Sequence, residues 1–274
     1  MQKTELHTDG KFRKIYPKRH FPEVGMVPNT ICPGPYFQHT GTCRRNENIQ
    51  EKTVFSSFHG HTRSIVLKLI GLSGGPGNGK SAVAEIFREE GICVIDADKV
   101  CHAIYQEKDN EVIAAMRQRW GENIFDPEGF IDRKKIAEIV FNDEGERKFL
   151  DTLLHPEIFR RINILLEKEE GKNSSFAVLE AALLFESSWN HKMFRTITVW
   201  AREDIRMERL LARNWTREHA EKRIASQMPD SEKMELADYV LINNGTLEDL
   251  RSECRILLDT LRNEVNEKEK QNQI

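Results

Sequence analysis

A glycine-rich segment that ends in lysine and serine is the strongest chemical signal in the 274-residue sequence. Eight consecutive residues satisfy the phosphate-loop pattern: Gly74, Gly75, Pro76, Gly77, Asn78, Gly79, Lys80 and Ser81. Glycines allow backbone N–H groups to turn inward around phosphate oxygens, in conformations that other residues oppose. The pattern predicts that Lys80 reaches the terminal phosphates of ATP and that the Ser81 hydroxyl binds Mg²⁺.

The same residues could form an ordinary glycine-rich turn, so their context decides between the two interpretations. Residues 65–70 form an apolar, β-branched run that predicts a buried strand before the loop. A helical pattern follows from Ser81 to about Glu90, and the N-terminus of such a helix attracts phosphate. This order favours phosphate binding, and we include Ala82, at the start of the helix, in the predicted ATP site.

Two carboxylates, Asp96 and Asp98, follow a second predicted strand at residues 92–95. Ligands collect at the carboxyl ends of strands in open α/β sheets, and phosphoryl transfer to a hydroxyl uses a carboxylate as proton acceptor. Aspartate is also a favoured N-cap of helices, a role that suits Asp96. The pair therefore predicts a catalytic site, with capping as the structural alternative.

Three arginines lie on a predicted helix at residues 204–214: Arg206, Arg209 and Arg213. Arg209 and Arg213 are four residues apart and share one helical face. Arginine forks bind oxyanions and stabilise a phosphoryl group in transfer. The alternative is an exposed face with ion pairs to Glu203 and Glu208, and the residues alone leave both open.

The elements around these residues predict an α/β fold. Strands are expected at 65–70, 92–95, 176–179, 196–200 and 239–242. Helices are expected at 97–106, 111–120, 133–141, 144–154, 156–170, 204–214, 217–227 and 247–261. Alternating strands and helices predict a P-loop NTPase-type three-layer α/β/α fold with a five-stranded parallel sheet. The helices within about 97–175 are expected to form an inserted subdomain, and residues 263–274 are expected to form a polar tail.

Composition limits the functions that this fold can serve. The net charge of −3 conceals +5 in residues 1–64 and −8 in the rest, and an acidic body argues against nucleic-acid binding. The sequence has no apolar run of about 20 residues, which argues against membrane insertion. Five scattered cysteines without a CxxC pair indicate a reducing compartment, so a cytoplasmic protein is expected. Residues 1–64 are rich in proline and histidine and are predicted to be a disordered extension, with zinc binding a weak alternative.

Over about residues 65–262 the series of motifs resembles the dephospho-coenzyme A kinase family. The matching segments are 70–75 with Gly77 and 79–81, 94–98, 131–133, 154–156, Glu180 with 183–186, Arg209-Leu210 with Arg213, 223–228, 237–240 and 243–245. The resemblance implies transfer of the ATP γ-phosphoryl, with Mg²⁺, to the ribose 3′-hydroxyl of dephospho-CoA. It makes Asp98 the base, Lys80 the phosphate-binding lysine, and Arg209 and Arg213 the lid arginines.

The same resemblance makes the helical insertion the substrate subdomain, with Asp96, Arg133 and His155 as substrate-binding residues. It makes residues about 203–230 a lid, and it places Asn243 near the adenine. His155 is equally interpreted as a packed histidine. Cys101-His102, Glu180 and Ala182 depart from the family pattern, as do Pro76 and Ala82, but none removes a residue that the transfer requires. The other hypotheses are a P-loop kinase for a nucleoside monophosphate or other small metabolite, and a regulatory nucleotide-binding module. A monomer or weak homo-oligomer is expected.

Overall fold

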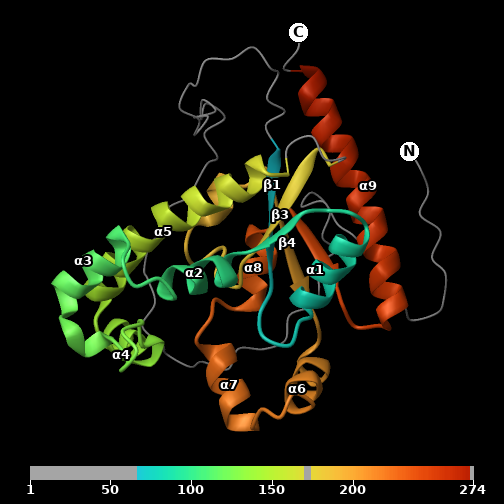
Figure 1. Cartoon of the computed structure of the whole chain (residues 1–274). Helices are drawn as coiled ribbons and strands as arrows, with labels where there is room; N and C mark the ends of the chain where they lie inside the picture. The colour runs from blue at the N-terminus through green and yellow to red at the C-terminus, as the bar shows by residue number, and fades with distance from the viewer. Residues whose placement is uncertain (1–66, 170–173, 272–274) are drawn as a thin grey trace, which may run out of the picture. The chain divides into compact units, whose positions relative to one another are not determined.

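Five parallel strands form one sheet in the order β2-β3-β1-β4-β5. Figure 1 shows β1, β3 and β4 between the surrounding helices. The structure is a computed structural model that describes residues 67–169 and 174–271. The strands are β1 (Lys68–Ser73), β2 (Val94–Asp96), β3 (Phe176–Glu180), β4 (Arg195–Trp200) and β5 (Tyr239–Ile242). The five-stranded parallel sheet and the α/β class are therefore confirmed.

β1 is the central strand of the sheet, so its side chains are buried on both faces. Ile70 and Leu72 pack with α1 (Lys80–Glu89) and α9 (Leu247–Gln271), which cover one face together. On the opposite face, a Cβ at Gly71 would lie 2.6 Å from a methyl carbon of Leu184. This alternation follows the two-residue period of a strand, and it accounts for the apolar residues and the glycine from Leu69 to Leu72.

The long connection between β2 and β3 contains most of the remaining helices and has its own apolar core. Its helices are α2 (Ala97–Tyr105), α3 (Glu111–Trp120), α4 (Arg133–Asn142) and α5 (Glu144–Glu167), with a 3₁₀ turn at Glu122–Ile124. The core residues Ile104, Ile113, Met116 and Ile162 are fully buried. The same core continues into the sheet through Leu179. A separate cluster of side chains thus anchors the insertion to the sheet.

One long helix replaces the two that the sequence predicts around Pro156. α5 runs for 24 residues with Pro156 inside it, so the predicted break after Leu154 is wrong. Proline removes only one helical hydrogen bond, and burial of Leu154, Ile158 and Ile162 along one stripe holds both halves in line.

The C-terminal segment corrects a second prediction. α9 continues to Gln271, so most of the expected polar tail is helical. Val265 is buried, and the Glu264 carboxylate accepts hydrogen bonds from the Tyr239 hydroxyl at 2.6 Å and from Arg195 Nε at 2.8 Å. Few apolar residues mark this part of the sequence, but one buried valine and one glutamate dock it on β4 and β5.

The region of the predicted lid contains α6 (Glu203–Leu211) and α7 (Arg217–Ala225), and then α8 (Asp230–Leu236), which the sequence analysis did not predict. Within the described ranges, no helix is both long and apolar enough to cross a bilayer. The predicted disorder of residues 1–64, and zinc binding there, lie outside the described residues.

We expect Glu264→Ala to lower the free energy of unfolding by about 1–2 kcal/mol, because two partly buried hydrogen bonds between α9 and the sheet are lost. Chemical denaturation measures this change. Glu267→Ala, an exposed position on the same helix, is the matched control. Equal effects of the two substitutions would show that Glu264 does not dock the end of α9.

Candidate active site

The phosphate loop follows β1 at the point where the strand order reverses. β3 lies on one side of β1, and β4 lies on the other. Such switch points are where open α/β sheets bind ligands. Gly77 and Gly79 have φ values of 80° and 98°, which favour glycine. Gly79 is the N-cap of α1 and supplies no side chain to cap it. The first N–H groups of the helix therefore point toward the loop without a side-chain acceptor, as phosphate binding requires.

Buried amides hold the loop from behind. Asn78 is fully buried, and its Oδ1 accepts a hydrogen bond from the backbone N–H of Ala201 at 3.2 Å. Asn243, at the end of β5, donates from Nδ2 to the carbonyl oxygen of Asn78 at 2.9 Å. The structure thus places Asn243 against the loop itself.

Glu180 is a central residue of the site for which sequence analysis proposed no role. It ends β3, where it pairs in register with Leu72 of β1, and is 4% exposed. Its Oε1 lies 2.7 Å from Lys80 Nζ and 3.4 Å from the Ser81 hydroxyl, while Arg88 approaches its other oxygen at 3.5 Å. A carboxylate that ends the strand next to the phosphate-loop strand was the available signal.

The carboxylates that follow β2 have separate positions. Asp96 is the N-cap of α2 and accepts from the backbone N–H of Lys99 at 3.1 Å, as the capping alternative predicted. Asp98 lies in the first turn of that helix, open to solvent on one side. Desolvation by the surrounding protein raises the pKa of Asp98; the Lys80 charge opposes this shift and the Asp96 charge adds to it.

Arg133, the first residue of α4, also lowers the pKa of Asp98 through its charge, while the charge of Glu180 raises it. The sheet register pairs Asp96 at the end of β2 with Glu180 at the end of β3, and Glu180 contacts Lys80, the first residue of α1. Asp98 follows Asp96 by two residues, so the chain brings it to the same edge of the sheet as the phosphate-loop lysine.

Arg206, Arg209 and Arg213, the three arginines of the predicted helix at 204–214, differ in their surroundings. Arg209 donates from Nη2 to Asn243 Oδ1 at 3.3 Å, whereas its buried Nη1 has no hydrogen-bond partner among the described residues. Desolvation and the neighbouring charge of Arg213 lower the pKa of Arg209. Arg213 is exposed, and Arg206 is buried in a contact with Asp230. An unpaired buried guanidinium nitrogen beside the phosphate loop suits an anionic ligand.

His155 has mainly packing contacts. Its ring meets Trp189 edge to face at 5.0 Å, and its Nε2 lies 3.6 Å from a carboxylate oxygen of Asp151. Desolvation lowers the pKa of His155. These contacts fit the packed-histidine alternative, and a substrate contact stays a prediction.

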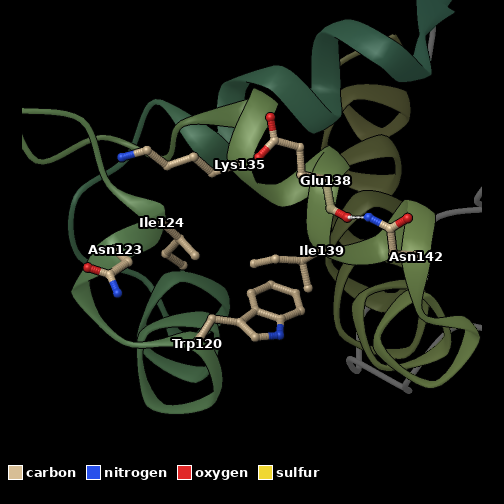
Figure 2. A pocket seen from close by; sticks show the side chains of 7 residues that line it. All are labelled: Trp120, Asn123, Ile124, Lys135, Glu138, Ile139 and Asn142. Carbon is tan, nitrogen blue, oxygen red and sulfur yellow. Dashed lines mark hydrogen bonds between the residues drawn. The ribbon is translucent and has the colours of Figure 1, made fainter.

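A pocket in the insertion is separate from these residues (Figure 2). It is lined by Trp120, Asn123, Ile124, Lys135, Glu138, Ile139 and Asn142. None of these residues belongs to the predicted site. The Trp120 indole N–H donates to Glu146 Oε2 at 2.8 Å, so its position is explained by packing of the insertion.

Comparison with known proteins agrees with this geometry. A family model for dephospho-CoA kinases matches residues 68–249. The chain belongs to the dephospho-CoA kinase family. The dephospho-CoA kinase of Aquifex aeolicus is 37% identical over 195 residues, which are 71% of this chain and 98% of that protein. The dephospho-CoA kinase of Geobacillus kaustophilus is 40% identical over 69% of this chain and 94% of that protein.

Two solved structures are similar to this chain, and one of them is a dephospho-CoA kinase. The protein TT1252 from Thermus thermophilus has a TM-score of 0.62 and 33% identity, over 71% of this chain and 98% of that chain. The dephospho-CoA kinase from Campylobacter jejuni has a TM-score of 0.53 and 28% identity, over 71% of this chain and 97% of that chain. The resemblance inferred from the motifs is thereby confirmed.

We expect Gly79→Ala to abolish measurable ATP binding and to lower stability. A Cβ at this position would lie 2.0 Å from Asn243 Nδ2, and the φ of 98° is strained for alanine. Gly91→Ala is the matched control, since Gly91 has a φ of 78° but open space around its Cβ. It should cost about 1 kcal/mol and leave ATP affinity intact. Thermal unfolding measures the cost of the strained φ that both variants share, and titration with ATP measures the affinity that only the clash at residue 79 should lower. Undiminished ATP binding by Gly79→Ala would contradict the loop geometry.

Proposed function

We propose that this chain transfers the γ-phosphoryl group of ATP to the ribose 3′-hydroxyl of dephospho-CoA, which yields coenzyme A in the final step of its biosynthesis. Membership of the dephospho-CoA kinase family supports this reaction. The observation that carries it is the position of Asp98 in the first turn of α2, two residues after Asp96, which pairs in register with Glu180, the carboxylate that contacts Lys80. A hydroxyl acceptor needs such a proton acceptor beside the phosphate site.

ATP binding falls to the phosphate loop and the lid. The backbone N–H groups of the loop and the N-terminus of α1 bind the phosphates. The flexible side chain of Lys80 adds a positive charge that can follow the phosphates during transfer. Arg209 offers its unpaired Nη1 to the γ-phosphoryl group, where negative charge is concentrated during transfer. Arg213, exposed in the turn that follows α6, completes the clamp when ATP is bound.

Mg²⁺ fits the oxygens beside Lys80. The Ser81 hydroxyl and the Glu180 carboxylate lie 3.4 Å apart, and both are hard oxygen donors of the kind that Mg²⁺ prefers. No three His, Cys, Asp or Glu side chains gather as a metal cage within residues 67–169 and 174–271. Mg²⁺ commonly keeps waters and nucleotide phosphates as most of its ligands, so one or two protein oxygens are enough to hold it. Bound to ATP, Mg²⁺ would neutralise charge on the phosphates.

The acceptor binds on the side of the insertion. Asp98 takes the proton of the 3′-hydroxyl while the oxygen of that hydroxyl attacks the γ-phosphorus. ADP leaves with the bridging oxygen. Arg133 at the start of α4 supplies a positive charge toward the substrate phosphates. Asp96 orders the first turn of α2, which carries Asp98, and His155 lines the acceptor side with its exposed edge. The comparisons give no support to the nucleoside monophosphate or small-metabolite alternative.

A cytoplasmic location is part of the proposal, because ATP is the phosphoryl donor and Cys101 and Cys254, among the described residues, are free thiols. We also propose that one chain contains a complete site and acts as a monomer or weak homo-oligomer.

Incubation of the pure protein with Mg-ATP and dephospho-CoA should yield coenzyme A, detected by mass. We expect Lys80→Ala and Asp98→Asn each to lower turnover at least about a hundredfold, because each removes a group used in transfer. Glu218→Gln, an exposed change on α7, is the control and should keep full activity. Turnover of adenosine monophosphate or shikimate in preference to dephospho-CoA would contradict the assigned acceptor.

The pH dependence of kcat/KM tests the base. Asp98 must be ionised to accept a proton, so kcat/KM should rise with pH through a pKa above the ordinary aspartate value of about 4. Asp98→Asn should abolish this rise. Because folding raises the pKa of Asp98, its ionised form opposes folding above that pKa, so Asp98→Asn should unfold at the same or a higher temperature at neutral pH. A wild-type pH profile in Asp98→Asn would remove Asp98 from this role.

A further inference from the structure

α8 is a short helix that follows the predicted lid and has buried charged residues at two successive turns. Asp230 is its first residue, and Lys233 lies three positions later. Lys233 is fully buried, and the side chain of Asp230 is 13% exposed. Charged side chains are rarely buried unless partners satisfy them, so each should be bound to another part of the fold.

Asp230 contacts the phosphate loop through two partners. Its Oδ2 accepts a hydrogen bond from Asn78 Nδ2 at 3.1 Å and another from Arg206 Nη1. Arg206 donates in turn from Nε to the carbonyl oxygen of Pro76 at 3.2 Å. Asp230 thus binds one loop residue directly and a second through Arg206.

The two charged groups also pack on the loop. A Cβ at Gly75 would lie 2.8 Å from Asp230 Oδ1 and 3.2 Å from Arg206 Nη2. A Cβ at Gly77 would lie 2.8 Å from the backbone oxygen of Arg206. The outer side of the loop is therefore in direct contact with this pair, and its inner side remains for phosphate.

Lys233 fixes the other side of α8. Its Nζ donates to the carbonyl oxygen of Ala182 at 3.0 Å and lies 2.9 Å from Glu186 Oε1. The Ser73 hydroxyl, at the end of β1, donates to the same Ala182 oxygen at 3.3 Å. Asp230 is therefore carried by a helix that is tied to the segment following β3, and this segment is itself bonded to the end of β1.

We propose that Asp230 is a positioning residue that, through Asn78 and Arg206, holds the phosphate loop in the shape that accepts ATP, while Lys233 anchors the helix that carries it. This inference rests on the proposed function only in that the loop binds ATP. A loop with four glycines has many conformations, and fixing one of them before binding lowers the entropic cost of association. Asp230 touches no reacting atom, so its effect should be on ATP affinity.

Asp230→Asn tests the charge. The amide keeps an acceptor for Asn78, but Arg206 is left buried without its counterion, so ATP should bind about tenfold more weakly. The dissociation constant of ATP is measured by direct titration, and the KM for dephospho-CoA is measured in parallel. The KM for dephospho-CoA should change less than twofold. Asp204→Asn, which breaks the exposed pair with Arg202 on α6, is the control and should change neither value.

Two neutral double variants test the hydrogen bond without any buried unpaired charge, so they remain informative if Asp230→Asn fails to fold. Arg206→Gln with Asp230→Asn retains an acceptor for Asn78, whereas Arg206→Gln with Asp230→Ala does not. We expect the first to bind ATP at least about fivefold more tightly than the second. If both bind ATP equally and within twofold of the wild type, Asp230 only stabilises the fold and the proposal is wrong.

These outcomes are separate from those of the proposed function. A protein that binds ATP but makes no coenzyme A would contradict the assigned reaction, while the order of ATP affinities among the variants would still decide the role of Asp230. A normal reaction rate together with unchanged ATP affinities would reject Asp230 alone.

Discussion

The pairing of β1 with β3 on one side and β4 on the other is the constraint on which the site depends. It places the end of β1 at the switch point of the sheet, so the phosphate loop has neighbours from both halves of the chain (Figure 1). β3 brings Glu180 to Lys80, and β4 brings Ala201 to the buried side of Asn78. Any other strand order would separate these residues, although their positions along the sequence would be the same.

Positive charge is distributed unequally around the loop. Lys80 has the buried Glu180 as partner, and Arg206 has Asp230, so the charges of both are balanced within the protein. Arg209 is different because desolvation and Arg213 both act against its charge, and its Nη1 has no hydrogen-bond partner among the described residues. The charged form of Arg209 is thus destabilised in the fold, and a bound anion would stabilise it. Ionisable groups perturbed in this way cluster at functional sites.

Two errors in the predicted elements have one physical origin. Pro156 favours a helix break, and the polar end of the chain favours fraying, as local preferences indicate. In both places a few buried side chains override the local preference: Ile158 and Ile162 continue the stripe of α5, and Val265 docks α9. α8 was missed for the related reason that its polar sequence has little apolar periodicity, while Lys233 is held by polar contacts made far along the chain.

The sequence by itself determined the phosphate loop, the five strands, the family and most of the candidate residues, because these depend on local spacing and on the order of motifs. Gly79, Lys80 and Ser81 need only the strand and helix beside them to show their chemistry. The tertiary structure decided which charged residues are partners. Glu180 is 100 residues from Lys80 and Asp230 is 152 residues from Asn78, and no local pattern relates residues so far apart. Only the folded sheet and its covering helices bring them within hydrogen-bond distance.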